Sequence, residues 1–441
     1  PLRSIITGII PKAPVDVDTN SIRDTESVVS NNESKRGGET IEEMLHTLYN
    51  DAEMQLMEIL GLIRCLFFMG DYQESLTPAI QLGGIDLIMQ LLSWKEPIVV
   101  IDTLRMASAF LAHKKFANLF IDKGGVHRIL QLQHMTAILD GIGLCLTAIA
   151  AVPSVLDRFC QLQCAVPDES LFPQIVSLVV EMLERPVSEL HNVAADFLHY
   201  ALSVPVFLNQ FDAKPSHLQA LINVLLSVQR QGISVTIEDK HVACSILLAL
   251  RSWFRSHLIL ACLHLWPKSK RVRALSRVSS SGYHTLPIDS ATMNSILMAL
   301  EGTTLESIAG VSGPPRVAIS AASRLGHVVL NPVLSACAGA GGPDSAPSHK
   351  TCSALAGLTR LRYSAAVRFL DAEGVRSVVG LLPIAFEWQI PDIIERCMDV
   401  LELLCVSPFA RMAVATHEEA NGRKGIGIIL EAASGECGVT D

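Results

Sequence analysis

One short pattern occurs twice in the chain, 41 residues apart. Apolar residues with helical spacing lead to Gly83-Gly84 and then to a second apolar run, and the same order recurs around Gly124-Gly125. A glycine pair between two helical patterns ends one helix, because glycine reaches the left-handed conformation at little steric cost. The next helix can then start at a steep angle. We therefore expect a helical hairpin at each pair, with Gly125 as a left-handed cap.

A period of this length is typical of armadillo and HEAT repeats, which contain two or three helices per unit. One hairpin cannot bury its apolar face alone, so such units must stack. The alternative is two unrelated helix ends that share a glycine pair by coincidence. The pattern returns at Glu373-Gly374, with glutamate in place of the first glycine. The predicted fold is all-α: an armadillo/HEAT-like α-solenoid of stacked helical repeats, with an irregular middle and a disordered N-terminal tail.

Composition divides the chain into four segments. Residues 1–40 are polar and cannot bury enough surface to order themselves, which predicts a disordered tail or linker. Residues 41–266 form a first block of armadillo-like repeats. Residues 267–350 combine a basic linker with an irregular region rich in Gly, Pro, Ser and Ala, and with a short helix. Residues 351–436 form a second block of repeats, in which the helical period resumes.

Two apolar stretches test the repeat interpretation. The helical period begins at Ile41, and we expect Met54, Ile59 and Ile63 to line the first stacked pair. Residues 141–156 are the best candidate for a membrane span, but they fall short of the roughly 20 residues needed to cross hydrocarbon. We interpret them as a buried repeat helix and its turn, and we expect no contact with a membrane.

Overall charge excludes one class of function. The formal net charge is −9 and the sequence pI is near 5.9, whereas a nucleic-acid binder needs a basic surface that releases counterions. Aromatic residues make up only 5% of the chain against 49% hydrophobic residues, a balance that suits stacked helices better than an all-β core. We expect no nucleic-acid partner, and any basic function must be local.

The basic stretch between the two blocks is such a local feature. Short runs of lysine and arginine on flexible backbone can act as nuclear-import signals. A loop kept soluble by its charge is an equally good interpretation. The first alternative predicts a protein of the nucleus, with the cytoplasm as a second location. The proposed import signal consists of Lys268, Lys270, Arg271 and Arg273.

The sequence contains no arrangement typical of an enzyme. Neither a Gly-x4-Gly-Lys-Ser/Thr nucleotide loop nor a Gly-x-Ser-x-Gly elbow is present. The 14 histidines are scattered singly, and the closest cysteine pair, Cys160 and Cys164, has no second pair at zinc-site spacing. We predict a non-enzyme with no catalytic residues, no cofactor, no metal site and no small-molecule ligand. An enzyme that uses the irregular middle as an active-site loop is unsupported by any constellation of residues.

Several short segments resemble the armadillo-like region of the Vpr-binding protein family, whose members are substrate receptors of cullin 4 ubiquitin ligases with a WD40 propeller. The resemblance covers roughly residues 50–436 and is strongest before residue 265. The matching residues are mostly packing and turn residues, so they identify a family without identifying a site. They include Gly70-Asp71-Tyr72-Gln73-Glu74, Gln81-Leu82-Gly83, Lys115-Phe116-Ala117, Gly124-Gly125-Val126, Ala249-Leu250-Arg251 and Asp399-Val400-Leu401.

This resemblance implies a scaffold and self-association role in substrate ubiquitination, carried out by protein contacts. In the family, a Trp-Asp-x-Arg motif in the propeller docks the ligase adaptor. None of the four tryptophans here is followed by aspartate, so the adaptor is expected to dock through a propeller outside this chain, and protein substrates are the other expected partners. The alternative is a stand-alone armadillo or HEAT adaptor in transport or cytoskeletal assembly. A downstream propeller in the parent protein would favour the ligase.

Overall fold

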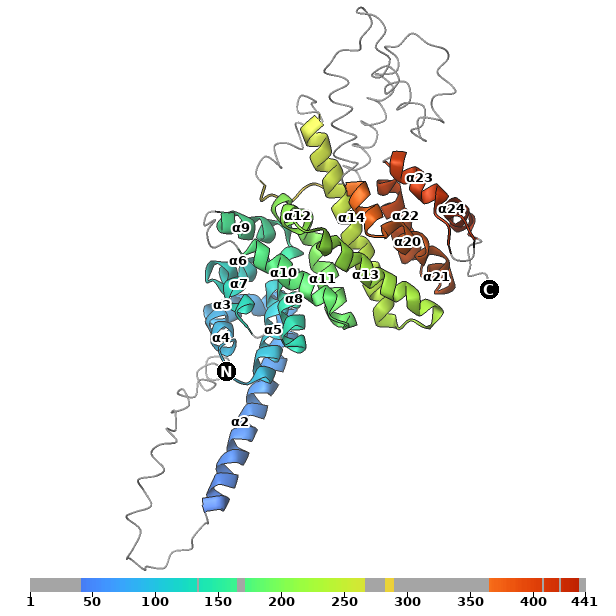
Figure 1. Cartoon of the computed structure of the whole chain (residues 1–441). Coiled ribbons are helices and arrows are strands. Elements are labelled where there is room, and N and C mark those ends of the chain that lie inside the picture. Colours follow the sequence, from blue (N-terminus) through green and yellow to red (C-terminus); the bar gives the residue numbers. More distant parts are fainter. Residues whose placement is uncertain are drawn as a thin grey trace, which may run out of the picture. The chain divides into compact units, whose positions relative to one another are not determined.

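The computed structural model describes residues 41–132, 135–164, 171–265, 282–288, 365–406, 408–419 and 422–435. Within these ranges all regular secondary structure is helical, apart from one isolated β-bridge between Glu418 and Lys424. Figure 1 shows the helices coloured along the sequence. The predicted all-α, armadillo-like fold class is confirmed. The predicted tail at 1–40 lies outside the described residues.

The chain forms two compact units, Pro1–Gly141 and Ile142–Asp441. The helices of the first unit follow one another in groups of three, joined by short turns. The first helix of one group packs along the first helix of the next, as the contact between α2 and α5 shows. The first group is α2 (Ile41–Gly70), α3 (Gln73–Gln81) and α4 (Gly84–Leu91), and the second is α5 (Pro97–Leu111), α6 (Lys114–Asp122) and α7 (Gly125–Leu130).

Two polar contacts and one close approach fix α2 against its neighbours. Arg64 Nε donates to Asp102 Oδ2 of α5 at 2.7 Å, and His113 Nε2 lies 2.7 Å from the carbonyl oxygen of Gly70. A Cβ atom at Gly70 would lie 2.8 Å from the Cβ of Ala109. Glycine at the end of α2 therefore lets the two backbones approach more closely than any side chain would permit.

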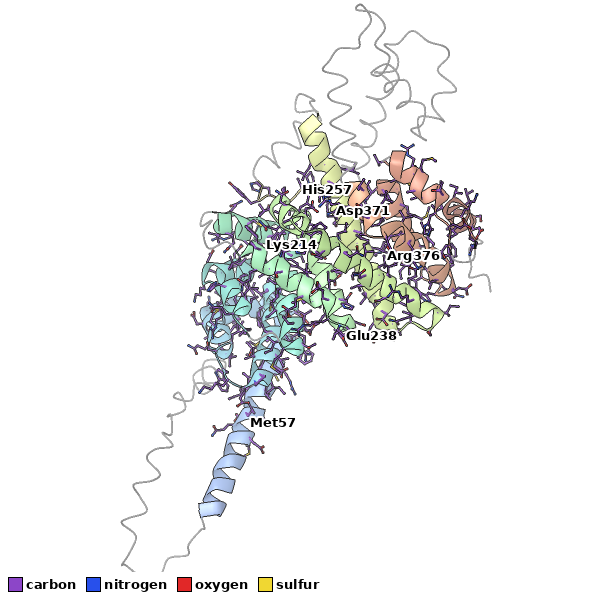
Figure 2. The ribbon with its side chains drawn as sticks, viewed as in Figure 1. Met57, Lys214, Glu238, His257, Asp371 and Arg376 are labelled. Atoms are coloured by element: carbon purple, nitrogen blue, oxygen red, sulfur yellow. The ribbon has the colours of Figure 1, made fainter. Side chains whose placement is uncertain are left out.

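Among the residues of α2 whose side chains the structure describes, 53–70, the buried ones lie in the C-terminal part. Ile59, Leu60 and Ile63 are buried, whereas Met54 and Met57 are each 66% exposed; Figure 2 labels Met57 on the projecting part of the helix. The expectation that Met54 lines the first stacked pair is therefore wrong. The reason is length, since α2 has 30 residues and α5 only 15, so α5 spans roughly 22 Å and covers about half of its neighbour.

The second unit continues the grouping in threes. The α8 helix crosses the unit boundary. Each later group again has a first, a second and a third helix, and in one group the third position is divided between two short helices, α20 and α21. The groups are α8 (Thr136–Ala150), α9 (Pro153–Cys164) and α10 (Phe172–Glu184); α11 (Ser188–Ala201), α12 (Pro205–Asp212) and α13 (Pro215–Gln231); α14 (Ile237–Leu265), the helical residues 365–371, α20 (Gly374–Val379) and α21 (Leu381–Glu387); and α22 (Pro391–Leu404), α23 (Pro408–Thr416) and α24 (Gly425–Ser434).

Helices of equal rank stack on one another in this unit. Among first helices, α14 packs along both α11 and α22, and among third helices α13 contacts α10 and α20 while α21 contacts α24 (Figure 1). The sequence between α14 and residue 365 is thus an insertion inside one group of helices. That group begins in the predicted first block and ends in the predicted second.

Local sequence explains where many helices begin. Proline is the first residue of α5, α9, α12, α13 and α22, a position where its missing N–H costs nothing and its fixed φ suits the helix.

Packing inside the second unit depends on a few aromatic rings among many aliphatic side chains. Phe172 makes edge-to-face contacts with Phe159 and Phe207, at centroid distances of 5.9 and 5.0 Å.

Two apolar stretches lie mostly inside the protein. Residues 141–156 include the end of α8 and the start of α9, and these two helices meet at 103°. Within the described residues, the helical stretch Ile237–Leu260 of α14 is long and apolar enough to span a membrane, but 72% of it is buried inside the protein. Its apolar surface is accounted for by contacts with α11 and α22.

Candidate functional site

The predicted turn residues lie at three equivalent positions between a second and a third helix. Gly83, Gly124 and Glu373 each adopt the left-handed conformation, with φ of 80°, 75° and 58°. Gly124 N–H donates to Ile121 O at 2.9 Å, and Gly124 O accepts from Arg128 N–H at 3.0 Å. One residue thus ends the second helix and begins the third.

The second residue of each pair has a different role. Gly125 is the first helical residue of α7, so the expectation that it is the left-handed cap is wrong, and Gly124 has that conformation. A Cβ atom at Gly125 would lie 2.4 Å from the ring of Phe120, and one at Gly374 would lie 2.5 Å from the ring of Phe369. At Gly84 the obstacle is the carbonyl oxygen of Ala79, at 2.8 Å. The residue five positions earlier therefore occupies the space of the missing side chain.

A polar cluster joins α12, α14 and the helical residues 365–371. Trp253 Nε1 donates to Asp212 Oδ1 at 2.9 Å, and His257 Nε2 lies 2.9 Å from Asp212 Oδ2. Arg368 Nη1 approaches Asp212 Oδ1 at 3.1 Å, and the guanidinium lies over the Trp253 ring, 5.7 Å from its centre. The cluster connects helices on both sides of the insertion.

Opposing effects act on the ionisation of this carboxylate. Burial would raise the pKa of Asp212, but the contacts with His257 and Trp253 and the charge of Arg368 outweigh it, so the pKa lies below its ordinary value. The charged form is thus the one that the surroundings favour. A second ion pair, between Arg251 Nε and Asp399 Oδ2 at 2.9 Å, links α14 to α22.

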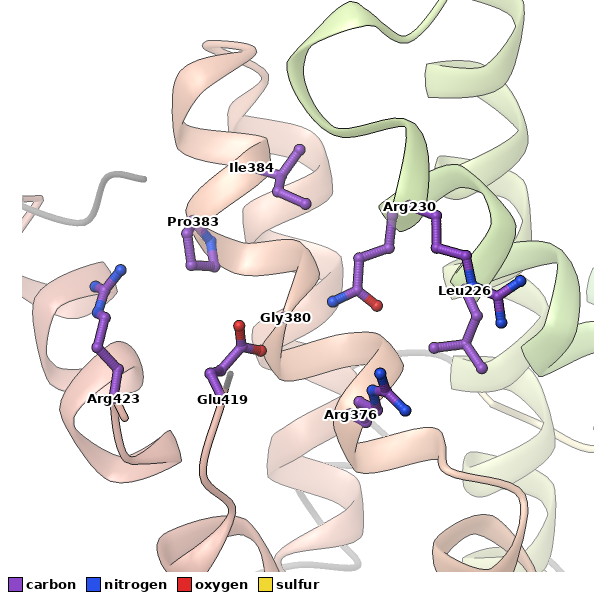
Figure 3. A pocket seen from close by; sticks show the side chains of 9 residues that line it. Leu226, Arg230, Arg376, Gly380, Pro383, Ile384, Glu419 and Arg423 are labelled. Atoms are coloured by element: carbon purple, nitrogen blue, oxygen red, sulfur yellow. The ribbon is translucent and has the colours of Figure 1, made fainter. Parts of the chain in front are cut away.

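A pocket of about 260 Å³ opens where α13 meets α20, α21 and the turn before α24 (Figure 3). Three arginines and one glutamate lie in its lining, beside aliphatic side chains and a glycine. The volume is below the 300–1,000 Å³ of typical small-molecule sites, so it suits a side chain better than a cofactor. The lining consists of Leu226, Gln229, Arg230, Arg376, Gly380, Pro383, Ile384, Glu419 and Arg423.

No sequence pattern pointed to this pocket or to the Asp212 cluster. The three arginines of the lining, which are far apart in the sequence, are Arg230, Arg376 and Arg423. Only Arg376 stands close to a predicted turn, three residues after Glu373. The proposed import signal, Lys268, Lys270, Arg271 and Arg273, lies outside the described residues.

Buried thiols and scattered histidines offer little chemistry in the described part of the chain. Burial raises the pKa of the Cys145 and Cys397 thiols, which keeps them protonated and unreactive. Burial also lowers the pKa of His199, whose Nδ1 lies 2.8 Å from Ser252 Oγ between α11 and α14. In these same ranges no group of three or more His, Cys, Asp or Glu side chains is placed to hold a metal ion.

Comparison with known proteins identifies relatives of both halves of the chain. The family model described as the Mahjong helical domain matches residues 14–163, and the model described as the DCAF1 helical domain matches residues 349–441. Together the two matches span more than half of the chain.

Two relatives and one solved structure illustrate the likeness. The DDB1- and CUL4-associated factor homolog 1 of Arabidopsis thaliana is 23% identical over 411 residues, which are 86% of this chain and 18% of the relative. Protein mahjong of Drosophila melanogaster is 26% identical over 184 residues, which are 41% of this chain and 11% of the relative. The chain spans less than a fifth of the length of these relatives. A designed armadillo repeat protein, 14% identical, aligns with 56% of this chain and 93% of its own, with a TM-score of 0.37.

Proposed function

We propose that this chain, which belongs to the family of DDB1- and CUL4-associated factor 1 homologues, is the armadillo-like scaffold region of a substrate receptor for a cullin 4 ubiquitin ligase. It acts by binding proteins and not by catalysis. The observation that carries this proposal is the match of two helical-domain models, one in each half of the chain. Stacked helical repeats present extended surfaces that suit this role.

Docking of the ligase adaptor is assigned to a part of the parent protein outside this chain. The relatives are more than five times longer than the segment that they share with this chain. The four tryptophans here are followed by Lys95, Phe254, Pro267 and Gln389, which excludes a Trp-Asp-x-Arg motif at any of them. The repeats would then hold substrates or further copies of the receptor beside the ligase core.

Affinity purification with two baits tests this proposal. The parent protein and residues 1–441 are expressed in the same cells, and the co-purified proteins are identified by mass spectrometry. Recovery of cullin 4 and its propeller adaptor with the parent, but weakly or not at all with the fragment, is the expected result. Absence of both from the parent sample would contradict the ligase assignment and leave a repeat adaptor of another pathway.

The basic stretch supports a proposal about location. Lys268, Lys270, Arg271 and Arg273 form a nuclear-import signal, and the parent protein works mainly in the nucleus. Deleting residues 268–277 should shift a fluorescent fusion of the chain toward the cytoplasm. A matched deletion of the same length in the N-terminal segment, residues 16–25, serves as the control. An unchanged nuclear signal after the first deletion would contradict the assignment.

A further inference from the structure

We infer that the pocket between α13 and α20–α21 binds an acidic side chain in an extended segment of a partner protein, with the carboxylate between Arg230 and Arg376. An aliphatic neighbour of that acidic residue would lie against Leu226 and Ile384. This inference deepens the proposed function and rests on it in one respect, that the chain acts by binding proteins. It adds the chemistry of the segment that is bound and the place where it binds.

The charges of the lining carry the inference. Arg230 is exposed at the end of α13, and its guanidinium forms no ion pair within the described ranges. Arg376 pairs with Glu373 at 2.9 Å, but the two side chains are 65% and 56% exposed, and exposed pairs of this kind contribute little and exchange readily. Two arginines are thus open to a new carboxylate, which a guanidinium can bind with two parallel hydrogen bonds.

The other half of the pocket is already neutralised. Arg423 forms an ion pair with Glu431, and its side chain is only 16% exposed. Figure 3 shows Glu419 between Arg423 on one side and Arg376 and Arg230 on the other. An incoming carboxylate is therefore repelled from the Glu419 end and attracted to the Arg230 end, which fixes where it binds.

Gly380 lies in the pocket lining, where the absence of a side chain leaves room for two polar groups. A Cβ atom at this position would lie 2.0 Å from Gln229 Nε2 and 2.5 Å from Glu419 Oε1. The side-chain amide of Gln229 and the carboxylate of Glu419 thus both reach the backbone there. Buried Leu226 and Pro383 and half-buried Ile384 complete an apolar wall. A pocket of about 260 Å³ with this lining accepts one acidic side chain and part of its neighbour.

Fluorescence anisotropy with defined peptides tests the inference on the whole chain. The probe is a fluorescein-labelled peptide with four glutamates around a central isoleucine, and its partner probe carries glutamine in place of every glutamate. The acidic probe should bind at least about tenfold more tightly than the neutral one, and its affinity should fall as salt rises, because the attraction between partly exposed charges is screened.

Three variants and one matched control locate the site. Arg230→Glu and Arg376→Glu should each weaken binding of the acidic probe at least about tenfold, because the new carboxylate repels the probe. Lys214→Glu makes the same kind of charge reversal about 24 Å from Arg230, just before the other end of α13, and it should leave binding within about twofold. Gly380→Val should also weaken binding, without a change of charge, because its side chain would displace Gln229 and Glu419 into the pocket. Figure 2 labels Lys214 and Arg376.

Every outcome of these titrations bears on the inference. Circular dichroism and thermal melting confirm that each variant remains folded. Equal affinity for the two probes, no binding of the acidic probe at about 1 mM, or equal effects of Arg230→Glu and Lys214→Glu would each overturn the site. Such a failure leaves the co-purification of the parent with cullin 4 untouched, so the two proposals are tested separately.

Discussion

The turn at Lys123–Gly125 in the first unit and the turn at Ala372–Gly374 in the second have nearly the same backbone but different sequences. The left-handed residue has φ 75° and ψ 20° at Gly124, and φ 58° and ψ 26° at Glu373. Its N–H donates to the preceding helix at 2.9 Å in the first turn and at 3.0 Å in the second. Glutamate therefore fits where the other turn uses glycine, at the cost of backbone strain.

The position that follows shows the opposite behaviour. Both turns have glycine there, and in both the ring of the phenylalanine five residues earlier occupies the space of a Cβ atom. Strain at a left-handed residue costs about 1–2 kcal/mol, which a stacked repeat can tolerate. A Cβ atom that overlaps a fully buried ring cannot be accommodated in this way, because the ring has no space to move into. The second glycine, and not the first, is therefore the stringent requirement of this turn.

The largest expected effect comes from adding one methyl group at this second position. Gly125→Ala and Gly374→Ala should each lower the free energy of unfolding by about 2–3 kcal/mol, because the new Cβ overlaps a buried ring. Gly61→Ala is the matched control, since a Cβ at Gly61 meets no atom within 4 Å and alanine is a better helix former, by about 0.5–1 kcal/mol. Chemical unfolding followed by circular dichroism measures all three. Equal effects at the three positions would contradict the proposed packing.

The next effect concerns how the helix before each turn is held. In the first unit α6 follows α5 closely in sequence, whereas the helix ending at Asp371 is separated from α14 by the insertion and contacts it through the Asp212 cluster. Asp212→Asn should therefore lower the free energy of unfolding by about 2 kcal/mol at neutral pH, since it weakens contacts to a charged group. Asp371→Asn, at an exposed position labelled in Figure 2, should change it by less than about 0.5 kcal/mol.

The effect of Asp212→Asn should depend on pH. Because the pKa of Asp212 is lowered in the folded protein, the contribution of the carboxylate is fully present above its unfolded pKa near 4 and is lost as pH falls through the lower, folded value. The difference in unfolding free energy between the wild type and the variant should thus shrink below about pH 4. If this difference in unfolding free energy stayed constant as the pH fell below about 4, the proposed role of the charged Asp212 would be contradicted.

The smallest effect comes from exchanging the left-handed residues. Glu373→Gly should raise the free energy of unfolding by about 0.5–1 kcal/mol, because relief of left-handed strain exceeds the entropy that glycine adds to the unfolded chain. Gly124→Glu should lower it by about 1–2 kcal/mol. The pair of Glu373 with Arg376 is largely exposed, so Arg376→Ala, which removes the ion pair alone, should cost less than about 0.5 kcal/mol. If Glu373→Gly and Gly124→Glu changed the free energy of unfolding in the same direction, the proposed strain at Glu373 would be contradicted.

Sequence reasoning identified the repeat because its signal is local. Gly83-Gly84 and Gly124-Gly125 stand at the armadillo period, and Glu373-Gly374 was recognisable from its neighbours. Which glycine is left-handed was predicted wrongly at Gly125, since that depends on hydrogen bonds that spacing does not specify. The contact between the ring of Phe120 and Gly125 could not be predicted either, although both residues lie in one short segment.

Features assembled from distant segments were beyond the sequence altogether. Asp212 and Arg368 are separated by 156 residues, and no periodicity relates them. The same holds for Arg230 and Arg376, which come together only because third helices stack. The extent of α2 burial was also missed, because it depends on the length of the neighbouring helix and not on the apolar pattern of α2 itself.

The most direct test of the repeated turn is a double-mutant cycle on Phe369 and Gly374. Phe369→Leu, Gly374→Ala and the double variant are unfolded chemically beside the wild type. If the ring occupies the space of the missing Cβ, the double variant should be at least about 1 kcal/mol more stable than the sum of the two single effects implies, because leucine leaves room for the methyl group. Additive effects within about 0.3 kcal/mol would contradict the account of why this position is glycine.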